Sequence, residues 1–333
     1  MALYLGIALA GIAVAAAASL AIGSEPISPD LVLHAVRGGE ALPGSPEAHA
    51  HAVVIDQRLP RTILGIAAGA ALGLAGALMQ ALTRNPLADP GLLGINAGAT
   101  FAVVLSITYL GVGSPAGYVW FALPGALLGA LVVYSIGAAG RDGPTPVRLA
   151  LSGIAVSAVL IGLTSGLLLS DIDTFDGYRV WTVGALAGRR LTGFGPAFAL
   201  VAAGSVVALA LGRSLNVIGM GEDQARSLGV NVARTRLLSV AAVTLLCGAT
   251  TAMAGPIGFV GLMVPHLARA ITGHDQRWAL PFSGVFGVIL VLASDIIGRV
   301  VAHPTELQLG LVTAFVGGPV LVGLARSTKL NLR

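Results

Sequence analysis

Charged residues are scarce in this chain. Asp, Glu, Lys and Arg together make up 10% of its 333 residues, whereas about a quarter of the residues in a soluble domain are charged. Apolar residues account for 56% of the sequence, and 46 glycines accompany them. So few charges cannot cover the apolar surface of a soluble fold. The composition therefore excludes an ordinary soluble enzyme, a disordered chain and a collagen, and it indicates an integral membrane protein.

Lysine and cysteine are also nearly absent. The only lysine, Lys329, is not part of a GxxxxGK[ST] phosphate-binding loop, which excludes a Walker-type ATPase. The sequence has no HExxH zinc motif and no GxSxG nucleophile elbow. Cys247 is the only cysteine, so no intrachain disulfide can form. We therefore predict no catalytic residue, no metal site and no cofactor in this chain, which is not expected to be an enzyme.

Long apolar runs are abundant. Residues 1–23 carry no charge, and because the run is too long for a signal peptide and lacks its basic flank, it is predicted to be the first span. Nine further runs follow at about 57–82, 92–110, 116–138, 147–170, 192–212, 234–255, 258–270, 279–302 and 306–325. A transmembrane helix needs about 20 residues, so the run at 258–270 is short and a half-helix stays open. The sequence predicts an all-α membrane protein with about ten transmembrane helices in one bundle, a single domain over 1–333.

Basic residues set the expected orientation. Placing both termini in the cytoplasm puts most arginines in inner loops and leaves the outer loops net acidic. The net charge of +4 is therefore assigned to cytoplasmic loops, and no nucleic-acid partner is expected. The outer connection at about 24–56 is predicted to be an irregular excursion. The inner connection at about 213–233 is long, basic and amphipathic.

Small residues recur along the second span. Gly65, Gly69 and Gly73 are spaced four apart, which lets another helix backbone approach closely in lipid. Helix packing is favoured over a glycine-lined conduit. In the outer loop, a solvated turn is favoured over a metal site for the acids Asp171, Asp173 and Asp176.

Polar groups gather in two places near the ends of predicted spans. The segment 80–96 has two prolines, two asparagines and a glutamine, and it suits either a gate or partner contact, or an ordinary turn. Asp295 and Arg299 lie one helical turn apart near the outer end of a span. They form either an internal pair or an outward arginine for an acidic partner.

The inner connection is the strongest signal from chemistry alone. Glu222 and Asp223 fall in the first turn of a short predicted helix, where the helix dipole favours acids. Ala225, Leu228 and Val232 are predicted to form its apolar face. Docking into a groove of another protein is favoured over an interfacial helix without a partner.

Four sequence strings resemble a known family. They are RLPRTILGIAAGAALGLAGALMQALTRNPLADPGLLGINAGA (58–99), GEDQARSLGV (221–230), GPIGFVGLMVPHLAR (255–269) and ASDIIGR (293–299). They resemble the permease subunits of type II ABC importers, the FecCD-like family that imports iron-siderophores, haem or vitamin B12. The resemblance covers essentially the whole chain.

The resemblance implies a FecCD-like permease fold of ten helices that pairs with a second, identical or homologous permease subunit around a central pathway. It also implies two ATP-binding subunits on the cytoplasmic side, which hold ATP and Mg²⁺, and a substrate-binding protein outside. The expected location is the cytoplasmic membrane of a bacterium.

Residue roles follow from the resemblance alone. The ATPase-coupling residues are Asn216, Gly221, Glu222, Ala225, Arg226, Leu228 and Gly229. The arginines that dock the binding protein are Arg58, Arg61 and Arg299. The inner gate is formed by Asn85, Leu87, Thr145, Pro146 and Val147, although GPTPVR (143–148) departs from the family's polar Ser/Thr run. His266, in the VPH string, is expected to be structural rather than a haem ligand.

Two other classes of membrane protein have requirements that this sequence can be compared with. An ion-coupled secondary transporter needs a membrane-embedded acid, and Asp295 is the single candidate. An intramembrane enzyme needs polar residues that converge at depth, and none is visible. Among the cargoes of the family, a ferric siderophore is expected because it is the commonest.

Overall fold

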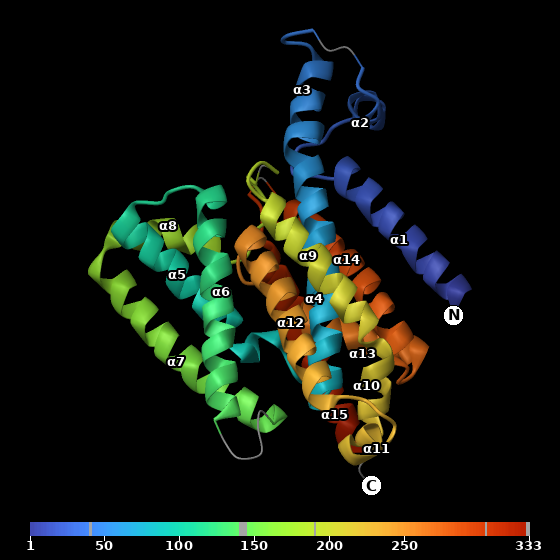
Figure 1. Ribbon diagram of the computed structural model, residues 1–333. Helices are drawn as coiled ribbons and strands as arrows, with labels where there is room; N and C mark the ends of the chain where they lie inside the picture. Colours follow the sequence, from blue (N-terminus) through green and yellow to red (C-terminus); the bar gives the residue numbers. More distant parts are fainter. Residues whose placement is uncertain (40–41, 140–144, 190, 304, 331–333) are drawn as a thin grey trace.

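The computed structural model describes residues 1–39, 42–139, 145–189, 191–303 and 305–330, and the regular structure within these ranges is entirely helical (Figure 1). Side chains are not described for Ala2, Pro115, Pro146, Ile172, Asp173, Asp176, Val180 and residues 324–330. The helices that correspond to predicted spans are α1 (Ala2–Ala21), α4 (Leu59–Thr83), α5 (Ile95–Leu110), α6 (Pro115–Ala138), α7 (Pro146–Ser170), α9 (Gly195–Ala210), α12 (Val232–Ala254), α13 (Val260–Thr272), α14 (Gln276–Val301) and α15 (Leu309–Leu330). The connecting helices are α2 (Pro29–Val36), α3 (Pro46–Val53), the π-helical turn η1 (Val54–Arg58), the 3₁₀ turn η2 (Pro90–Leu93), α8 (Ile172–Thr182), α10 (Gly212–Gly219) and α11 (Glu222–Ser227).

All ten predicted spans are helical, which confirms the predicted fold class. The 25 residues of α4 give a helix of about 38 Å, enough to cross a hydrocarbon core of about 30 Å. α13 has 13 residues, so it is as short as its apolar run indicated. α9 and α10 are bent by 47° at their junction, so the sixth apolar run continues into the inner connection at an angle.

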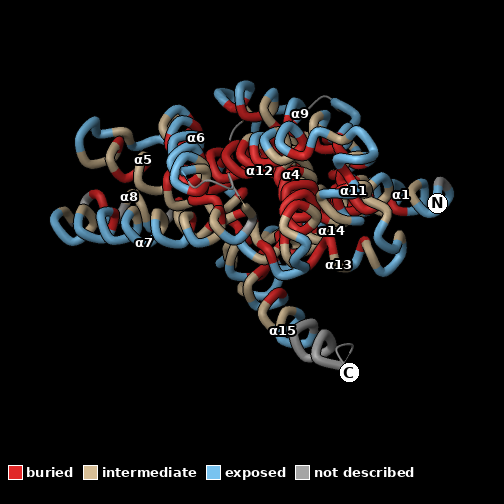
Figure 2. The backbone as a smooth tube through the Cα atoms, turned by 60° about the horizontal axis from the view of Figure 1, so that its bottom comes forward, coloured by how far each residue is buried: buried red, intermediate tan, exposed pale blue. Residues whose placement is uncertain are grey.

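Backbone contact between α4 and α14 forms the centre of the fold. A Cβ atom on Gly69 would lie 2.5 Å from the carbonyl oxygen of Gly287 and 2.6 Å from the Cα of Val288. Gly73 meets the backbone of Ser283 in the same way. The glycine stripe is therefore a helix-packing surface, as predicted. Figure 2 shows α4, α12 and α14 as the most buried part of the chain.

A second group of helices, α5 to α8, lies beside this centre (Figure 1). α5 and α6 approach closely where Gly98 faces Gly125, and α6 packs against α12. α7 covers the outer side of this group, and only 11% of its most apolar stretch is buried within the chain. Its apolar surface is therefore left for lipid or for a second subunit.

The prediction of an irregular outer connection is wrong. Ser45 accepts a hydrogen bond from the backbone N–H of Ala48, and Pro46 occupies the first turn of α3, so this serine and proline start a helix. α3, η1 and α4 run on as one continuous apolar helix of 38 residues. Figure 1 shows α2 and α3 projecting beyond the other helices, at the end opposite α11.

The prediction of a solvated turn around the outer acids is also wrong, because these residues open α8. The Asp171 carboxylate accepts hydrogen bonds from the backbone N–H (3.2 Å) and the hydroxyl (2.5 Å) of Thr174. A side-chain acceptor at this point satisfies a free backbone donor at the start of a helix. The side chains of Asp173 and Asp176 lie outside the described residues.

Candidate functional site

Two glycines fix the shape of the predicted coupling region, the segment from Asn216 to Gly229, which contains the second half of α10 and all of α11. Gly221 has φ +130° before α11, and Gly229 has φ +81° after it, so both adopt a backbone conformation that disfavours a side chain. Between them Ala225 is fully buried, and it packs with Ile218 and Val232. The region is therefore a compact helical turn rather than a loose loop.

Glu222 ties this turn to the neighbouring helices. Its carboxylate lies 2.7 Å from the guanidinium of Arg236 on α12 and 3.7 Å from that of Arg226. Arg84, at the end of α4, lies 4.0 Å away. Arginines from three places converge on one acid, so α11 is held against the C-terminal end of α4 and the N-terminal part of α12.

Asn216 ties α10 to the start of α14. Its amide nitrogen donates to the Asp275 carboxylate at 2.6 Å, and its amide oxygen accepts from the backbone N–H of Gln276 at 2.7 Å. Hydrogen bonds from Arg277 and Asn216 hold the pKa of Asp275 well below its usual range, so its carboxylate stays ionised. α14 in turn packs along α4, so a displacement of α10 reaches the central pair of helices directly.

The outward side of the coupling region is apolar and charged. Leu228 is 62% exposed and Met220 is 63% exposed, and the side chains of Asp223 and Arg226 are also open to solvent. The three residues of the predicted apolar face therefore do not lie together: α11 ends at Ser227, so Leu228 turns outward while Ala225 and Val232 are buried. Exposed apolar side chains beside charges are typical of a surface that another chain covers.

The predicted gate residues follow the end of α4 and lie at the start of α7. Asn85 and Leu87 are exposed, and the Asn85 side chain accepts from the backbone N–H of Leu87 at 2.9 Å. The Thr145 hydroxyl accepts from the backbone N–H of Arg148 at the start of α7, and Val147 is exposed. Pro146 is the first residue of α7, and its side chain lies outside the described residues. Their role as a gate stays a prediction.

Polar groups of the segment 80–96 make contacts across the chain. Gln80 donates to the carbonyls of Gly261 and Leu262 and accepts from Arg269. Asn96 accepts from the Thr251 hydroxyl at 2.8 Å. Burial raises the pKa of Asp89 although it accepts a backbone hydrogen bond from Gly91. The segment is therefore anchored in the protein rather than being a free turn.

Sequence reasoning missed a groove between α5 and α7 whose wall is mainly apolar and carries a few polar side chains. It has a volume of about 580 Å³, and Asn96, Thr100, Ser157, Thr164 and Ser165 contribute to its walls. The serines and threonine of α7 recur seven and eight positions apart, a spacing that places them on one helix face. That spacing is visible in the sequence and could have indicated that α7 has a face with polar side chains.

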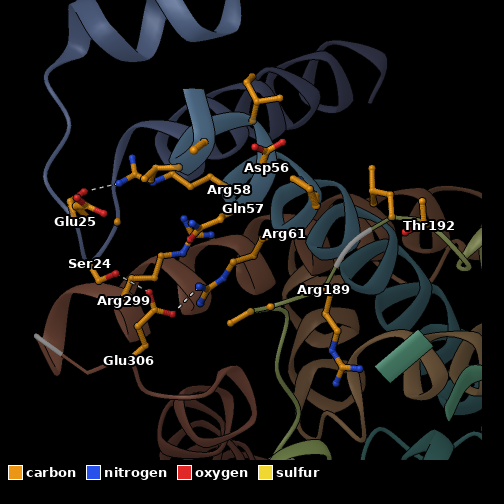
Figure 3. Close-up of a pocket in the computed structure, with 18 residues that line it drawn as sticks. Ser24, Glu25, Asp56, Gln57, Arg58, Arg61, Arg189, Thr192, Arg299 and Glu306 are labelled. Atoms are coloured by element: carbon orange, nitrogen blue, oxygen red, sulfur yellow. Dashed lines mark hydrogen bonds and ion pairs between the residues drawn. The ribbon is translucent and has the colours of Figure 1, made fainter. Parts of the chain in front are cut away.

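The three predicted docking arginines are buried at the end of the molecule opposite α11, beside a cavity of about 830 Å³ (Figure 3). Arg61 donates to Asp295 at 2.7 Å and to Glu306 at 2.6 Å, and Arg299 also pairs with Asp295. Burial alone would raise the pKa of Glu306, but the hydrogen bond and charge of Arg61 outweigh it and lower the pKa. Of the two alternatives for Asp295 and Arg299, the internal pair is the one present.

Two of these arginines also hold the end of α1. Arg58 donates to the carbonyls of Leu20 and Ala21 at 2.9 Å, and Arg299 donates to that of Ser19 at 2.7 Å. α1 has no basic residue in its own last turn. The arginines of η1 and α14 thus satisfy its free carbonyls and the negative end of its dipole. Their role in docking a binding protein stays a prediction.

The contacts of Asp295 bear on the alternative of ion-coupled transport. This acid is 1% exposed and accepts hydrogen bonds from both Arg61 and Arg299. A carboxylate neutralised by two fixed guanidiniums has no free capacity for a coupling cation. His266 on α13 is half-buried, and its expected structural role stays a prediction.

Known proteins of similar sequence and structure point to one family. The model of the FecCD transport family matches residues 11–327. The ferric enterobactin transport system permease protein FepD of Escherichia coli is 47% identical over 94% of this chain and 92% of its own length. The probable siderophore transport system permease protein YfiZ of Bacillus subtilis is 42% identical over 83% of each.

A solved structure agrees with these sequences. It is described as an inward-facing conformation of a metal-chelate type ABC transporter, and it superposes with a TM-score of 0.83 at 25% identity, covering 98% of this chain and 100% of that one. The family model and the relatives span almost the whole chain. The chain therefore belongs to the FecCD transport family and is a multi-pass membrane permease.

Proposed function

We propose that this permease carries a ferric siderophore across the cytoplasmic membrane of a bacterium as one subunit of an ABC importer. It pairs with a second permease subunit, two ATP-binding subunits hold ATP and Mg²⁺ on the cytoplasmic side, and an extracytoplasmic protein delivers the cargo. Both termini lie in the cytoplasm. The cargo class is supported by two similar proteins named for the transport of ferric enterobactin and of siderophores.

The contacts of Asn216 carry the proposal for coupling. Its two hydrogen bonds fasten α10 to the first residues of α14, and Glu222 fastens α11 to α12 through Arg236. A force applied to the coupling region therefore reaches α14, and through it α4, without passing through a flexible loop. Energy from ATP hydrolysis in another chain enters the permease here.

The exposed side of the coupling region is where an ATP-binding subunit sits. Met220 and Leu228 provide the apolar contact, and Asp223 and Arg226 provide the charged rim. The turns at Gly221 and Gly229 and the buried Ala225 preserve the shape of this surface. Helix-in-groove docking relies on such apolar anchors.

On the outer side, Arg58, Arg61 and Arg299 border the cavity that faces the binding protein. Changing Arg58 and Arg299 to Glu is expected to weaken docking of that protein in a pull-down, and assembly with the ATP-binding subunits, which is expected to persist, is measured on the same variant. Because both arginines also hold α1, the unfolding temperature of the variant is measured beside that of Arg37→Glu, an exposed outer arginine. Undiminished docking contradicts the role.

The inner gate is assigned to Asn85, Leu87, Thr145, Pro146 and Val147. A cysteine at Leu87 is expected to form a disulfide with its counterpart in the second permease subunit, and nucleotide is expected to change the yield. The native Cys247 is buried and does not compete. A yield unaffected by nucleotide contradicts the gate.

Uptake of a radiolabelled ferric siderophore into liposomes tests the whole proposal. The liposomes contain this chain, its ATP-binding partner and the binding protein. Uptake is expected to require ATP and to stop with vanadate. Uptake that proceeds without ATP and collapses with an ionophore would establish ion-coupled transport instead.

A further inference from the structure

Arg189 differs from the other arginines around the outer cavity. It lies in the connection between α8 and α9, it lines the cavity, and the residue is 6% exposed. Among the residues that the structure describes, no acid forms an ion pair with Arg189, and its Nη1 atom has no hydrogen-bond partner. Figure 3 shows its guanidinium lying apart from the cluster of Arg58, Arg61 and Arg299.

The remaining arginines of the cavity have internal partners. Arg61 and Arg299 share Asp295, Arg61 also meets Glu306, and Arg58 donates to the carbonyls of α1. Each of these three arginines therefore already has a partner within the chain. Arg189 is thus the cation of this cavity that the described part of the chain leaves unmatched.

Arg189 keeps its charge at neutral pH. Burial lowers its pKa to about 10, and the nearby Tyr118 works against that change. A guanidinium with this pKa is still protonated at pH 7. A buried charge without a partner is destabilising, and ionisable groups buried in membrane proteins mark the paths of substrates.

We propose that Arg189 binds the anionic face of the incoming metal chelate. The cavity of about 830 Å³ has room for a ligand of that size class, because small-molecule sites measure about 300–1,000 Å³. Gln57 and Thr192 also line the cavity and are exposed, and so are the acids Glu25 and Asp56. The anionic face of a chelate is therefore expected to turn toward Arg189 and away from these two carboxylates. Guanidinium groups bind carboxylate and phenolate oxygens through charge-assisted hydrogen bonds. The inference rests on the proposed function and narrows its cargo to anionic chelates.

Two iron(III) complexes of different charge test this site. A tris-catecholate complex is an anion, and a tris-hydroxamate complex is neutral. Binding of each is measured on the full chain with its ATP-binding partner in lipid nanodiscs. Arg189→Gln is expected to weaken binding of the anion about ten- to hundredfold, the loss of one or two charge-assisted hydrogen bonds, and to leave the neutral complex unaffected.

Two matched variants complete the test. Arg189→Lys keeps the charge but not the planar fork, so it is expected to bind the anion with intermediate affinity. Arg37→Gln removes an exposed outer arginine away from the cavity and is expected to bind like the unaltered chain. Because Arg189→Gln removes an unpaired buried charge, its unfolding temperature is expected to stay level or rise.

Several results would overturn the inference. If Arg189→Gln weakens binding of both complexes equally, or leaves binding of the anion unchanged, Arg189 does not distinguish the charge of the cargo. Loss of docking by the binding protein would assign the arginine to that protein, and a fall in unfolding temperature would reveal an internal partner. If the unaltered chain takes up iron with ATP while Arg189→Gln behaves identically, this inference fails and the proposed function stands. If no ATP-dependent uptake occurs at all, the proposed function fails.

Discussion

The contact between α4 and α14 makes a sharp prediction about Gly69. A methyl group on this residue would lie 2.5–2.7 Å from three backbone atoms of Gly287 and Val288, whereas Cβ atoms essentially never come within 3.0 Å and ordinary contact begins at 3.4 Å. Gly69→Ala therefore forces the two helices apart by about 0.5–1 Å. Overpacking of this kind costs about 1–3 kcal/mol.

Gly6→Ala is the matched control, because Gly6 lies on α1 and a methyl group placed there would have no atom within 4 Å. Both variants gain about the same helix propensity, up to about 1 kcal/mol, so the difference between them measures the strain alone. The assay is unfolding in mixed micelles, followed by the fluorescence of the three tryptophans. We expect Gly69→Ala to be about 1–3 kcal/mol less stable than Gly6→Ala. Equal stabilities would refute close backbone contact between α4 and α14.

Three further predictions concern the polar contacts. Asn216→Ala is expected to lower uptake per ATP hydrolysed about tenfold while the ATP-binding subunits still assemble, since the exposed Met220 and Leu228 are untouched; an unchanged ratio of uptake to phosphate release would contradict coupling through this residue. Arg299→Met leaves the buried Asp295 short of one partner and is expected to destabilise the chain by about 3–5 kcal/mol, measured by unfolding beside Arg37→Gln; a near-neutral effect would argue against the buried pair. The pKa of Glu306 is lower in the folded chain than in the unfolded one, so the stability from its pair with Arg61 is complete above the ordinary pKa of about 4.3 and is lost as the pH falls through the lowered value. Glu306→Gln should therefore be less stable than the unaltered chain by about 1 kcal/mol at neutral pH, and the gap should close in acid; a gap that widens in acid would reverse this assignment.

Apolar length and glycine spacing were sufficient to predict the spans, because both act through local sequence. Each of the ten runs became a helix, and the stripe at Gly65, Gly69 and Gly73 became a packing surface. The helices α2 and α3 were missed because each has only eight residues, too few to stand out as an apolar run of span length. Their start depends on single residues, such as the capping Ser45.

The contacts of the candidate site depend on partners that are distant in sequence. Arg61 and Asp295 are 234 positions apart, and Arg58 serves carbonyls of a helix that ends at Ala21. No spacing rule connects such residues. The resemblance to the family identified the arginines, but it did not predict that they are buried. Leu228 does not share a face with Ala225 and Val232, because α11 ends at Ser227 whereas the apolar pattern continued to Val232.

The π-helical turn η1 has a consequence for the two helices that project from the outer end. A π-turn contains one more residue than an α-turn, and each residue of an α-helix rotates the chain by about 100°. Removing one residue from η1 would swing α3, and α2 with it, by roughly that angle around the axis of α4. The number of residues in η1 thus sets the direction in which α2 and α3 point. Permeases that differ by one residue here would turn different sides toward the outside without any change in their surface chemistry.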